Sequence, residues 1–178
     1  MVESKNEEIN FTGPKLVTDI IMDIQFKPIG FIHTPYADDA PYTRYEEIDG
    51  EFYVELNKAY IDGLYLLDEL NYCYLIFYIH KSKKQPSLRV HPPRGGGKEV
   101  GLFATRSPNR FNPIGLTIAK IKKIEGNRIY TSGLDILDGT PLLDVKPYIR
   151  DFDMKEDANL GWIETTSRPE DKLSPDAF

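Results

Sequence analysis

The segment 72–79, with the sequence YCYLIFYI, decides the fold class of this chain. It carries no charge and is rich in aromatic and β-branched residues, which is typical of a central β-strand covered on both faces. Upstream of it, residues 50–56 alternate between apolar and polar side chains, as a half-buried strand does. The sequence around this segment therefore favours strands over helices.

Other short strand-like segments are separated by turn signals. Glu125-Gly126-Asn127 lies between two of them and predicts a hairpin. Helical periodicity is confined to residues 16–24 and 58–67. We therefore predict a mainly β fold, a single small β-barrel with short helical insertions and an N-terminal extension. The remaining predicted strands are 28–33, 100–104, 115–124, 128–134 and 142–148.

The 178 residues fit one domain with a single core. We expect the barrel to occupy residues 28–152, between an N-terminal extension at 1–27 and an acidic tail at 153–178. No apolar run reaches the roughly 18 residues that a membrane helix needs, and no signal peptide is apparent, so we expect a cytoplasmic protein. The single cysteine, Cys73, lies in the apolar segment and is expected in the core.

The charge of the chain is unevenly distributed. The net charge of −6 argues against a general nucleic-acid binder. However, eleven Lys or Arg and one acid, Glu99, lie between His80 and Lys123, so this segment carries +10 and the remainder −16. A basic face on an acidic body would suit a polyanion partner, whereas a solvated loop and a lysine-rich edge strand would need none. We favour the polyanion, because the segment contains the proline-rich loop described next.

The stretch Phe103–Gly115, FATRSPNRFNPIG, has two prolines and two arginines, and we call it the signature loop. Proline fixes φ and removes a backbone donor, so a stiff loop between strands is expected. Arg106 and Arg110 on such a loop indicate an anion-binding site.

Common alternative chemistries lack their motifs. Residues 94–98, RGGGK, do not have the spacing of a phosphate-binding loop, and no dinucleotide fingerprint follows a strand. The histidines and the cysteine lack metal-ligand spacing, so no metal is expected. His33 and His91 match no motif and are expected to be structural or solvated. Ser107 lacks the context of a nucleophilic serine.

Three motifs occur in the order found in one family. They are His80-Lys81-Ser82, the signature loop, and Leu134–Tyr148, LDILDGTPLLDVKPY. With them, residues 29–152 resemble the TsaA/TrmO-like family of small β-barrel tRNA methyltransferases. The resemblance implies S-adenosyl-L-methionine-dependent methylation of N6 of threonylcarbamoyladenosine, beside the anticodon of threonine tRNA. It also implies a homodimer with the site near the subunit interface.

The resemblance also implies which residues act. Asp138 is our candidate for a catalytic base that takes the proton from the target nitrogen. Phe111 stands where the family usually has proline, so an aromatic face is available for stacking at this point of the loop. Cofactor binding is implied for His80, Lys81, Arg106, Leu116, Asp138, Gly139, Thr140 and Pro141. Contacts to tRNA phosphates, or to the carboxylate of the modified base, are expected from Lys83, Lys84, Arg89, Arg94 and Arg110.

Two functions from other classes remain open. One is a non-catalytic RNA-binding barrel, in which the basic segment binds the backbone and tyrosines stack on bases. The other is a small-molecule-binding barrel that keeps the cofactor pocket without acting on RNA.

Overall fold

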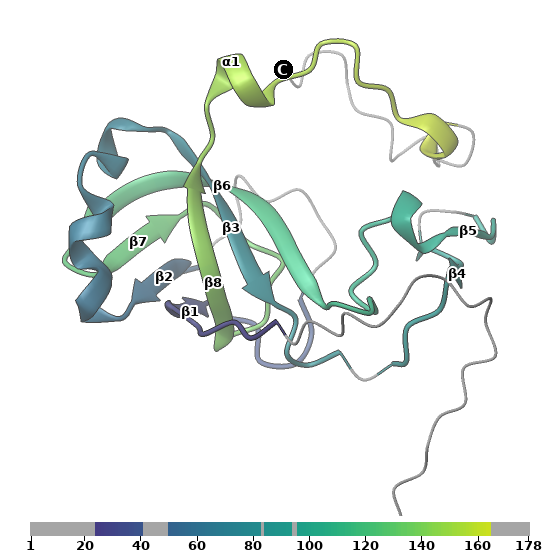
Figure 1. The fold of residues 1–178 in the computed structure, drawn as a ribbon, viewed down its shortest axis with the longest axis horizontal. Helices are drawn as coiled ribbons and strands as arrows, with labels where there is room; N and C mark the ends of the chain where they lie inside the picture. The colour runs from purple at the N-terminus through teal and green to yellow at the C-terminus, as the bar shows by residue number, and fades with distance from the viewer. Residues whose placement is uncertain (1–23, 41–49, 83, 94–95, 165–178) are drawn as a thin grey trace, which may run out of the picture.

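The computed structural model describes residues 24–40, 50–82, 84–93 and 96–164. Six strands pair in a ring in which every strand is antiparallel to both neighbours, and the last strand pairs back with the first (Figure 1). The prediction of a mainly β fold is therefore confirmed. In ring order the strands are β1 (Gly30–His33), β2 (Tyr53–Leu56), β7 (Arg128–Thr131), β6 (Ile114–Glu125), β3 (Tyr72–Tyr78) and β8 (Thr140–Pro147).

Strand β3 is the centre of this arrangement, since it pairs with β6 on one side and with β8 on the other. Its side chains alternate: Cys73 and Leu75 are fully buried, whereas Tyr72 and Tyr74 are only half-buried. The expectation that both faces are covered was thus wrong for the outer face. In this single chain only the inner side of the ring is filled by the core.

The core lies inside the ring and draws on all six strands. Ile32, Val54, Leu75, Ile129 and Leu142 are fully buried there. Cys73 belongs to the same cluster, and burial raises the pKa of its thiol to about 12. The prediction that this cysteine is a core residue is confirmed.

Two tight backbone positions shape the strands. Gly126 has φ +59° in the predicted turn between β6 and β7, a conformation that glycine adopts without strain. At Gly115, a Cβ atom would overlap the ring of Phe77 on β3. A side chain at position 115 would therefore force the Phe77 ring to move where the signature loop passes into β6.

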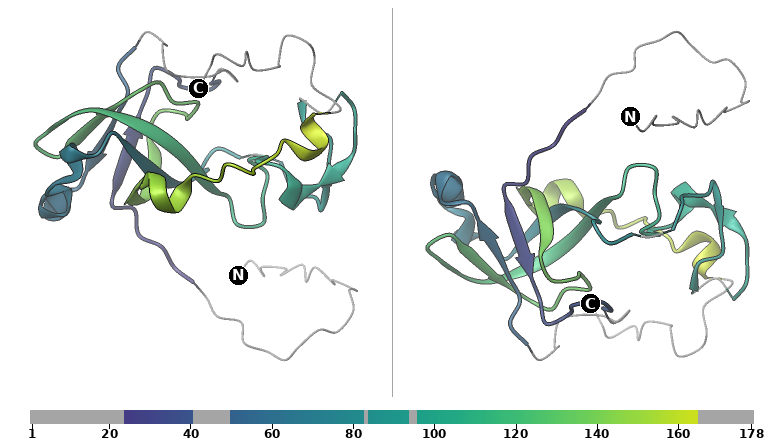
Figure 2. Two further views of the ribbon diagram at one scale, coloured as in Figure 1. Left: turned by 90° about the horizontal axis from the view of Figure 1, so that it is seen from above. Right: turned by 90° about the horizontal axis from the view of Figure 1, so that it is seen from below.

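A second, two-stranded sheet lies beside the ring (Figures 1 and 2). It consists of β4 (Arg89–Val90) and β5 (Val100–Gly101), and the 3-10 helix η4 (Leu102–Ala104) follows directly. The predicted strand 100–104 is thus shorter, because its last three residues form this turn. We call β4, β5 and η4 the small lobe.

The helical elements are short. The 3-10 helices η1 (Lys58–Leu64) and η2 (Leu67–Glu69) occupy the predicted insertion, while the periodic segment 16–24 lies outside the described residues except for Ile24. After β8 come α1 (Arg150–Asp153) and η5 (Gly161–Ile163). None of the helices in the described ranges is long and apolar enough to cross a membrane.

Candidate functional site

Two of the sequence motifs meet where β3 ends. His80 Nδ1 lies 3.4 Å from Oγ1 of Thr140, the first residue of β8. The threonine hydroxyl donates its one hydrogen to the carbonyl of Leu137 at 2.7 Å, so in its contact with His80 it can act only as an acceptor for Nδ1. Burial lowers the pKa of His80, and the neighbouring Lys81 lowers it further. Both effects favour the neutral form of the imidazole.

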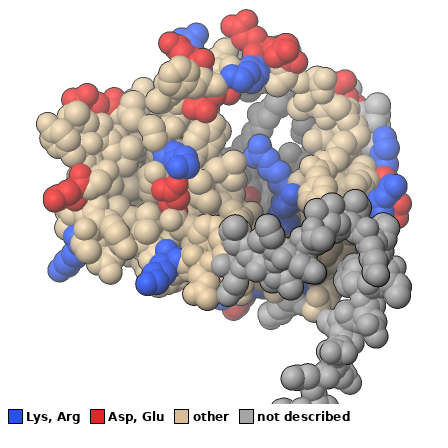
Figure 3. Space-filling model, in the orientation of Figure 1, with Lys and Arg blue, Asp and Glu red and all other residues tan. Residues whose placement is uncertain are grey.

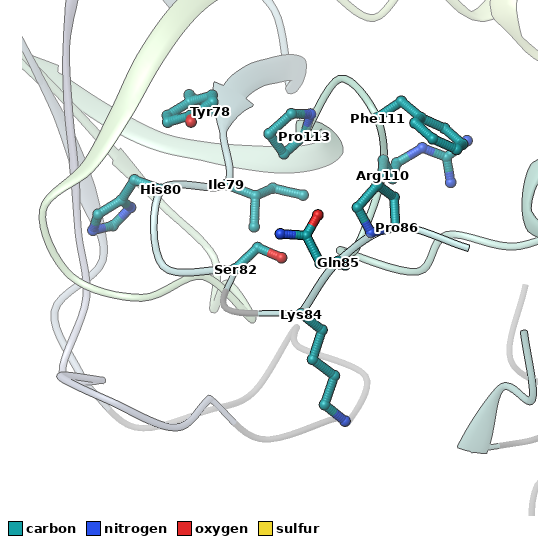
Figure 4. Close-up of a pocket in the computed structure, with 10 residues that line it drawn as sticks. All are labelled: Tyr78, Ile79, His80, Ser82, Lys84, Gln85, Pro86, Arg110, Phe111 and Pro113. Carbon is teal, nitrogen blue, oxygen red and sulfur yellow. The ribbon is translucent and has the colours of Figure 1, made fainter. Parts of the chain in front are cut away.

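A pocket of about 410 Å³ opens next to His80 (Figure 4). Arg110 and Phe111 of the signature loop form its far end, and the chain after β3 forms the near end. None of the described residues that line it is acidic, so it suits an anionic ligand. We call it the Arg110 pocket, and its lining is Tyr78, Ile79, His80, Ser82, Lys84, Gln85, Pro86, Arg110, Phe111 and Pro113.

Hydrogen bonds fix the two ends of this pocket to one another. The amide of Ile79 donates to the carbonyl of Pro113 at 2.7 Å. The hydroxyl of Ser82 donates to Oδ1 of Asn109 at 2.7 Å. The signature loop and the chain after β3 are thus joined at two points, in addition to the φ restriction that its prolines impose.

The Arg110 side chain is held in place before any ligand arrives. Its Nη1 donates to the carbonyl of Thr105 at 3.0 Å, and its guanidinium carbon lies 6.0 Å from the centre of the Phe103 ring. A guanidinium has five N–H donors, so most of them stay available to an anion. Lys84 is the second predicted RNA contact in the lining.

The Asp138 carboxylate faces a different place. Its Oδ1 accepts from the amide of Thr34 at 3.2 Å and lies 3.3 Å from Nδ1 of His33. The His33 ring stacks on Tyr53 at 4.7 Å between centroids, so His33 is a structural partner of Asp138, as expected of a histidine outside the motifs. Asp138 and these residues line a second, more open depression beside Glu51.

The other residues of the turn 138–141 contact β1 through the backbone. Gly139 has φ +70° and donates to the carbonyl of Ile32 at 3.0 Å, while Pro141 lies in register with Phe31. Lys81 reaches back over the same region, where its Nζ donates to the carbonyl of Ala37 at 2.6 Å. The DGTP turn and Lys81 are therefore brought together by the chain that follows β1.

Of the eight predicted cofactor residues, only His80 lines the Arg110 pocket and only Asp138 lines the second depression; the other six, Arg106 and Leu116 among them, line neither. Arg106 is exposed on the signature loop, and its guanidinium has no hydrogen bond or ion pair with other described residues. Leu116 lies on the outer face of β6 opposite Ile76 and is 55% exposed.

Some of the residues predicted to contact RNA lie in the Arg110 pocket and others do not. Arg110 and Lys84 share one pocket, whereas Arg89 on β4 pairs with Glu99 at 3.6 Å, the only acid of the basic segment. Lys83 and Arg94 lie outside the described residues. Figure 3 shows Lys and Arg side chains in the recess between the ring and the small lobe, below an upper edge rich in Asp and Glu.

Sequence reasoning did not assign several lining residues to a site. The sequence indicated only strand or loop for Tyr78, Gln85 and Pro86. Their position directly beside His80-Lys81-Ser82 and Lys83-Lys84 was a usable signal. Among the described residues, no group of three or more His, Cys, Asp or Glu has a geometry that would hold a metal ion.

Comparisons with known proteins agree with this arrangement of motifs. The family model described as the tRNA-methyltransferase O N-terminal domain matches residues 31–154. A probable S-adenosyl-L-methionine-binding protein of Pyrococcus abyssi is 37% identical over 155 residues, which are 86% of this chain and 83% of that protein. A tRNA (adenine(37)-N6)-methyltransferase of Mus musculus is 45% identical over 95 residues, or 53% of this chain.

The mouse enzyme is much longer than this chain. The match spans only 22% of the mouse enzyme. Among solved structures, the crystal structure of TrmO from Pseudomonas aeruginosa has a TM-score of 0.64 and 28% identity, covering 79% of this chain and 62% of that one. The extent of the family match and the similarity to the archaeal protein lead to one conclusion: this chain belongs to the tRNA-methyltransferase O family, a family of S-adenosyl-L-methionine-dependent tRNA methyltransferases.

Proposed function

We propose that this chain methylates N6 of threonylcarbamoyladenosine beside the anticodon of threonine tRNA, in the cytoplasm, with S-adenosyl-L-methionine as donor. The observation that carries the proposal is the contact between His80 and Thr140 at the edge of a cationic pocket. Two motifs that are 60 residues apart in sequence meet there, within a chain of the methyltransferase family.

The chemistry of His80 suits the methyl donor. S-adenosyl-L-methionine supplies, when bound, an activated methyl group on a positively charged sulfur. A neutral His80 gives hydrogen bonding without repelling that charge, and the lowered pKa of His80 favours this neutral form. The proposed cofactor residues are His80, Lys81, Arg106, Leu116, Asp138, Gly139, Thr140 and Pro141.

We propose that Arg106 and Leu116 act in a homodimer of such small β-barrels. Both are exposed in the single chain, and Leu116 belongs to a row of exposed apolar residues on the outer face of β6, with Ile114 at 39% and Ile118 at 48%. Tyr78 of the adjacent strand is 44% exposed and lies opposite Ile114. Three exposed aliphatic side chains in one row are costly in water, and a second copy would cover them.

The RNA is proposed to approach the Arg110 pocket. Arg110 and Lys84 would bind phosphate or the carboxylate of the modified base, because both are cations in a lining without described acids. Arg89 would join them once it leaves Glu99, together with Lys83 and Arg94. Phe111 and Tyr78 offer ring faces on which an unstacked base can pack.

Asp138 is proposed to accept the proton of the target nitrogen. Its carboxylate is 49% exposed, and His33 beside it can hold the charge in place through Nδ1. Because the donor is already activated, the chain's main contributions are position and electrostatics.

Transfer of a labelled methyl group to tRNA tests the proposal. The substrates are threonine tRNA with and without the threonylcarbamoyl group, and binding of S-adenosyl-L-methionine is measured separately by calorimetry. Transfer to the modified tRNA alone supports the proposal. Cofactor binding without transfer to any tRNA would favour a small-molecule-binding barrel, and tRNA binding without cofactor binding would favour a purely RNA-binding barrel.

A further inference from the structure

We propose that residues 154–164 form a strap that positions the signature loop, and that Trp162 is a positioning residue for Arg110. This inference rests on the proposed function, in which Arg110 contacts the tRNA. It concerns residues that lie almost wholly beyond the matched family domain, which ends at residue 154.

The strap joins the ring to the small lobe. After β8 the chain forms α1 and then runs across to η5, which lies next to the small lobe in the views of Figures 1 and 2. At its far end, the indole Nε1 of Trp162 donates to the carbonyl of Ala104 at 2.9 Å. These two residues are 58 positions apart, so the bond is a tertiary contact.

The geometry of the strap turns Trp162 toward that carbonyl. Gly161 has φ +55°, which lets the chain reverse just before the indole. On the other side, the carboxylate of Glu164 accepts from the amide of Leu160 at 3.3 Å and closes the turn. The Trp162 side chain is half-buried in this position.

From Ala104 the contact leads directly to Arg110. Thr105 is the next residue, and its carbonyl accepts from Nη1 of Arg110 at 3.0 Å. The hydroxyl of Thr105 donates to the carbonyl of Leu102 at 2.9 Å and accepts from the amide of Ser107 at 3.3 Å. Thr105 is thus held by Leu102 and Ser107, and the Trp162 bond to Ala104 adds a further restraint directly beside the carbonyl that holds the guanidinium.

A double-mutant cycle measures this coupling. Trp162→Phe keeps a ring but removes the N–H donor, and Arg110→Ala removes the side chain that the strap is proposed to position. We expect Trp162→Phe to weaken tRNA binding about threefold to tenfold in the parent chain. In the Arg110→Ala background it should have no further effect, since coupled residues are not additive. Leu160→Ala, an exposed residue of the same strap, is the matched control and should leave binding unchanged.

Hydrogen exchange supplies a readout that does not depend on RNA binding. Trp162→Phe should speed exchange at the amides of Thr105, Ser107 and Arg110, and should leave β3 unchanged. The strap proposal would be overturned if these loop amides exchanged as slowly in the variant as in the parent chain. It would also be overturned if Trp162→Phe caused the same loss of tRNA affinity with Arg110 and with Ala at that position. If the parent chain binds no tRNA, the proposed function fails while the exchange result still decides the role of the strap.

Discussion

His80 at the end of β3 contacts Thr140 at the start of β8 through Nδ1 and Oγ1, at 3.4 Å. This contact joins the turn after β3 to the first residue of β8, a strand that pairs directly with β3, and Thr140 is almost fully buried with 3% exposed. The imidazole therefore lies against a residue that the sheet holds in place, although His80 itself belongs to the turn after β3.

The His80 environment predicts how stability depends on pH. Burial and Lys81 lower the pKa of His80 in the folded chain, so the unfolded chain binds the proton more readily. The free energy of unfolding should therefore fall as the pH drops below the ordinary histidine pKa of 6.5 and be insensitive to this group above it. Denaturant titrations between about pH 5 and 8 check this, and His80→Gln should flatten that part of the profile. An unchanged slope in the variant would assign the effect to other groups.

Arg110→Ala should weaken tRNA binding about tenfold and reduce the salt dependence by about one counterion. Arg110→Lys should restore only part of the affinity, because lysine lacks the planar fork that also reaches the carbonyl of Thr105. Lys146→Ala is the control, since that lysine pairs with Asp144 on β8 at 2.8 Å. Filter binding at several salt concentrations gives both quantities; equal losses for both alanine variants would count against a specific role.

Phe111 should contribute to RNA binding through its ring. Phe111→Leu removes the aromatic face from the Arg110 pocket while keeping an apolar side chain, and should weaken tRNA binding about fivefold to tenfold. Phe111→Trp should retain the affinity. Binding of S-adenosyl-L-methionine, measured by calorimetry, should stay constant in both variants. A parallel loss of cofactor affinity would place the ring against the methyl donor instead.

Gly115→Ala should destabilise the fold by about 1–3 kcal/mol, because the new methyl group would overlap the ring of Phe77. Gly101→Ala is the matched control: nothing described lies within 4 Å of its added Cβ. Urea denaturation of both variants measures the difference. Similar midpoints would mean that the Phe77 ring moves aside without cost.

Ile118→Lys should convert a dimer to a monomer at micromolar concentration. The substitution places a charge at one end of the exposed row on β6, which we propose as the contact between two copies. Ile61→Lys, at a residue of η1 that is 37% exposed, is the control. Sedimentation velocity gives the oligomeric state directly. A parent chain that sediments as a monomer would contradict the proposed homodimer.

Local patterns predicted the strands well where each strand carries its own signal. The alternation at 50–56 and the glycine turn at 125–127 placed β2 and the β6–β7 hairpin near their observed positions. The half-exposed outer face of β3 was not predicted, because tyrosine is as common on a covered face as on an open one. The early end of β5 at Gly101 was not predicted either. It depends on the 3-10 turn that follows, and the sequence of that turn has no clear helical pattern.

The sequence predicted the motifs of the site but not the side-chain contacts that they make. The contact between His80 and Thr140 depends on strand register, and residue spacing alone does not reveal register. The pairing of Asp138 with His33 was not foreseen for the same reason, since β1 and β8 come from opposite ends of the domain. Trp162 gave no signal, because nothing in the tail indicates which distant carbonyl it will meet.

The closure of the ring has a consequence for how the protein matures. Thr34 and Asp138, which bond to each other, are separated by 104 positions, so nearly the whole domain must leave the ribosome before they can meet. Contacts this distant form slowly. A nascent chain arrested before β8 would carry the arginines of the signature loop but would have no DGTP turn folded against β1.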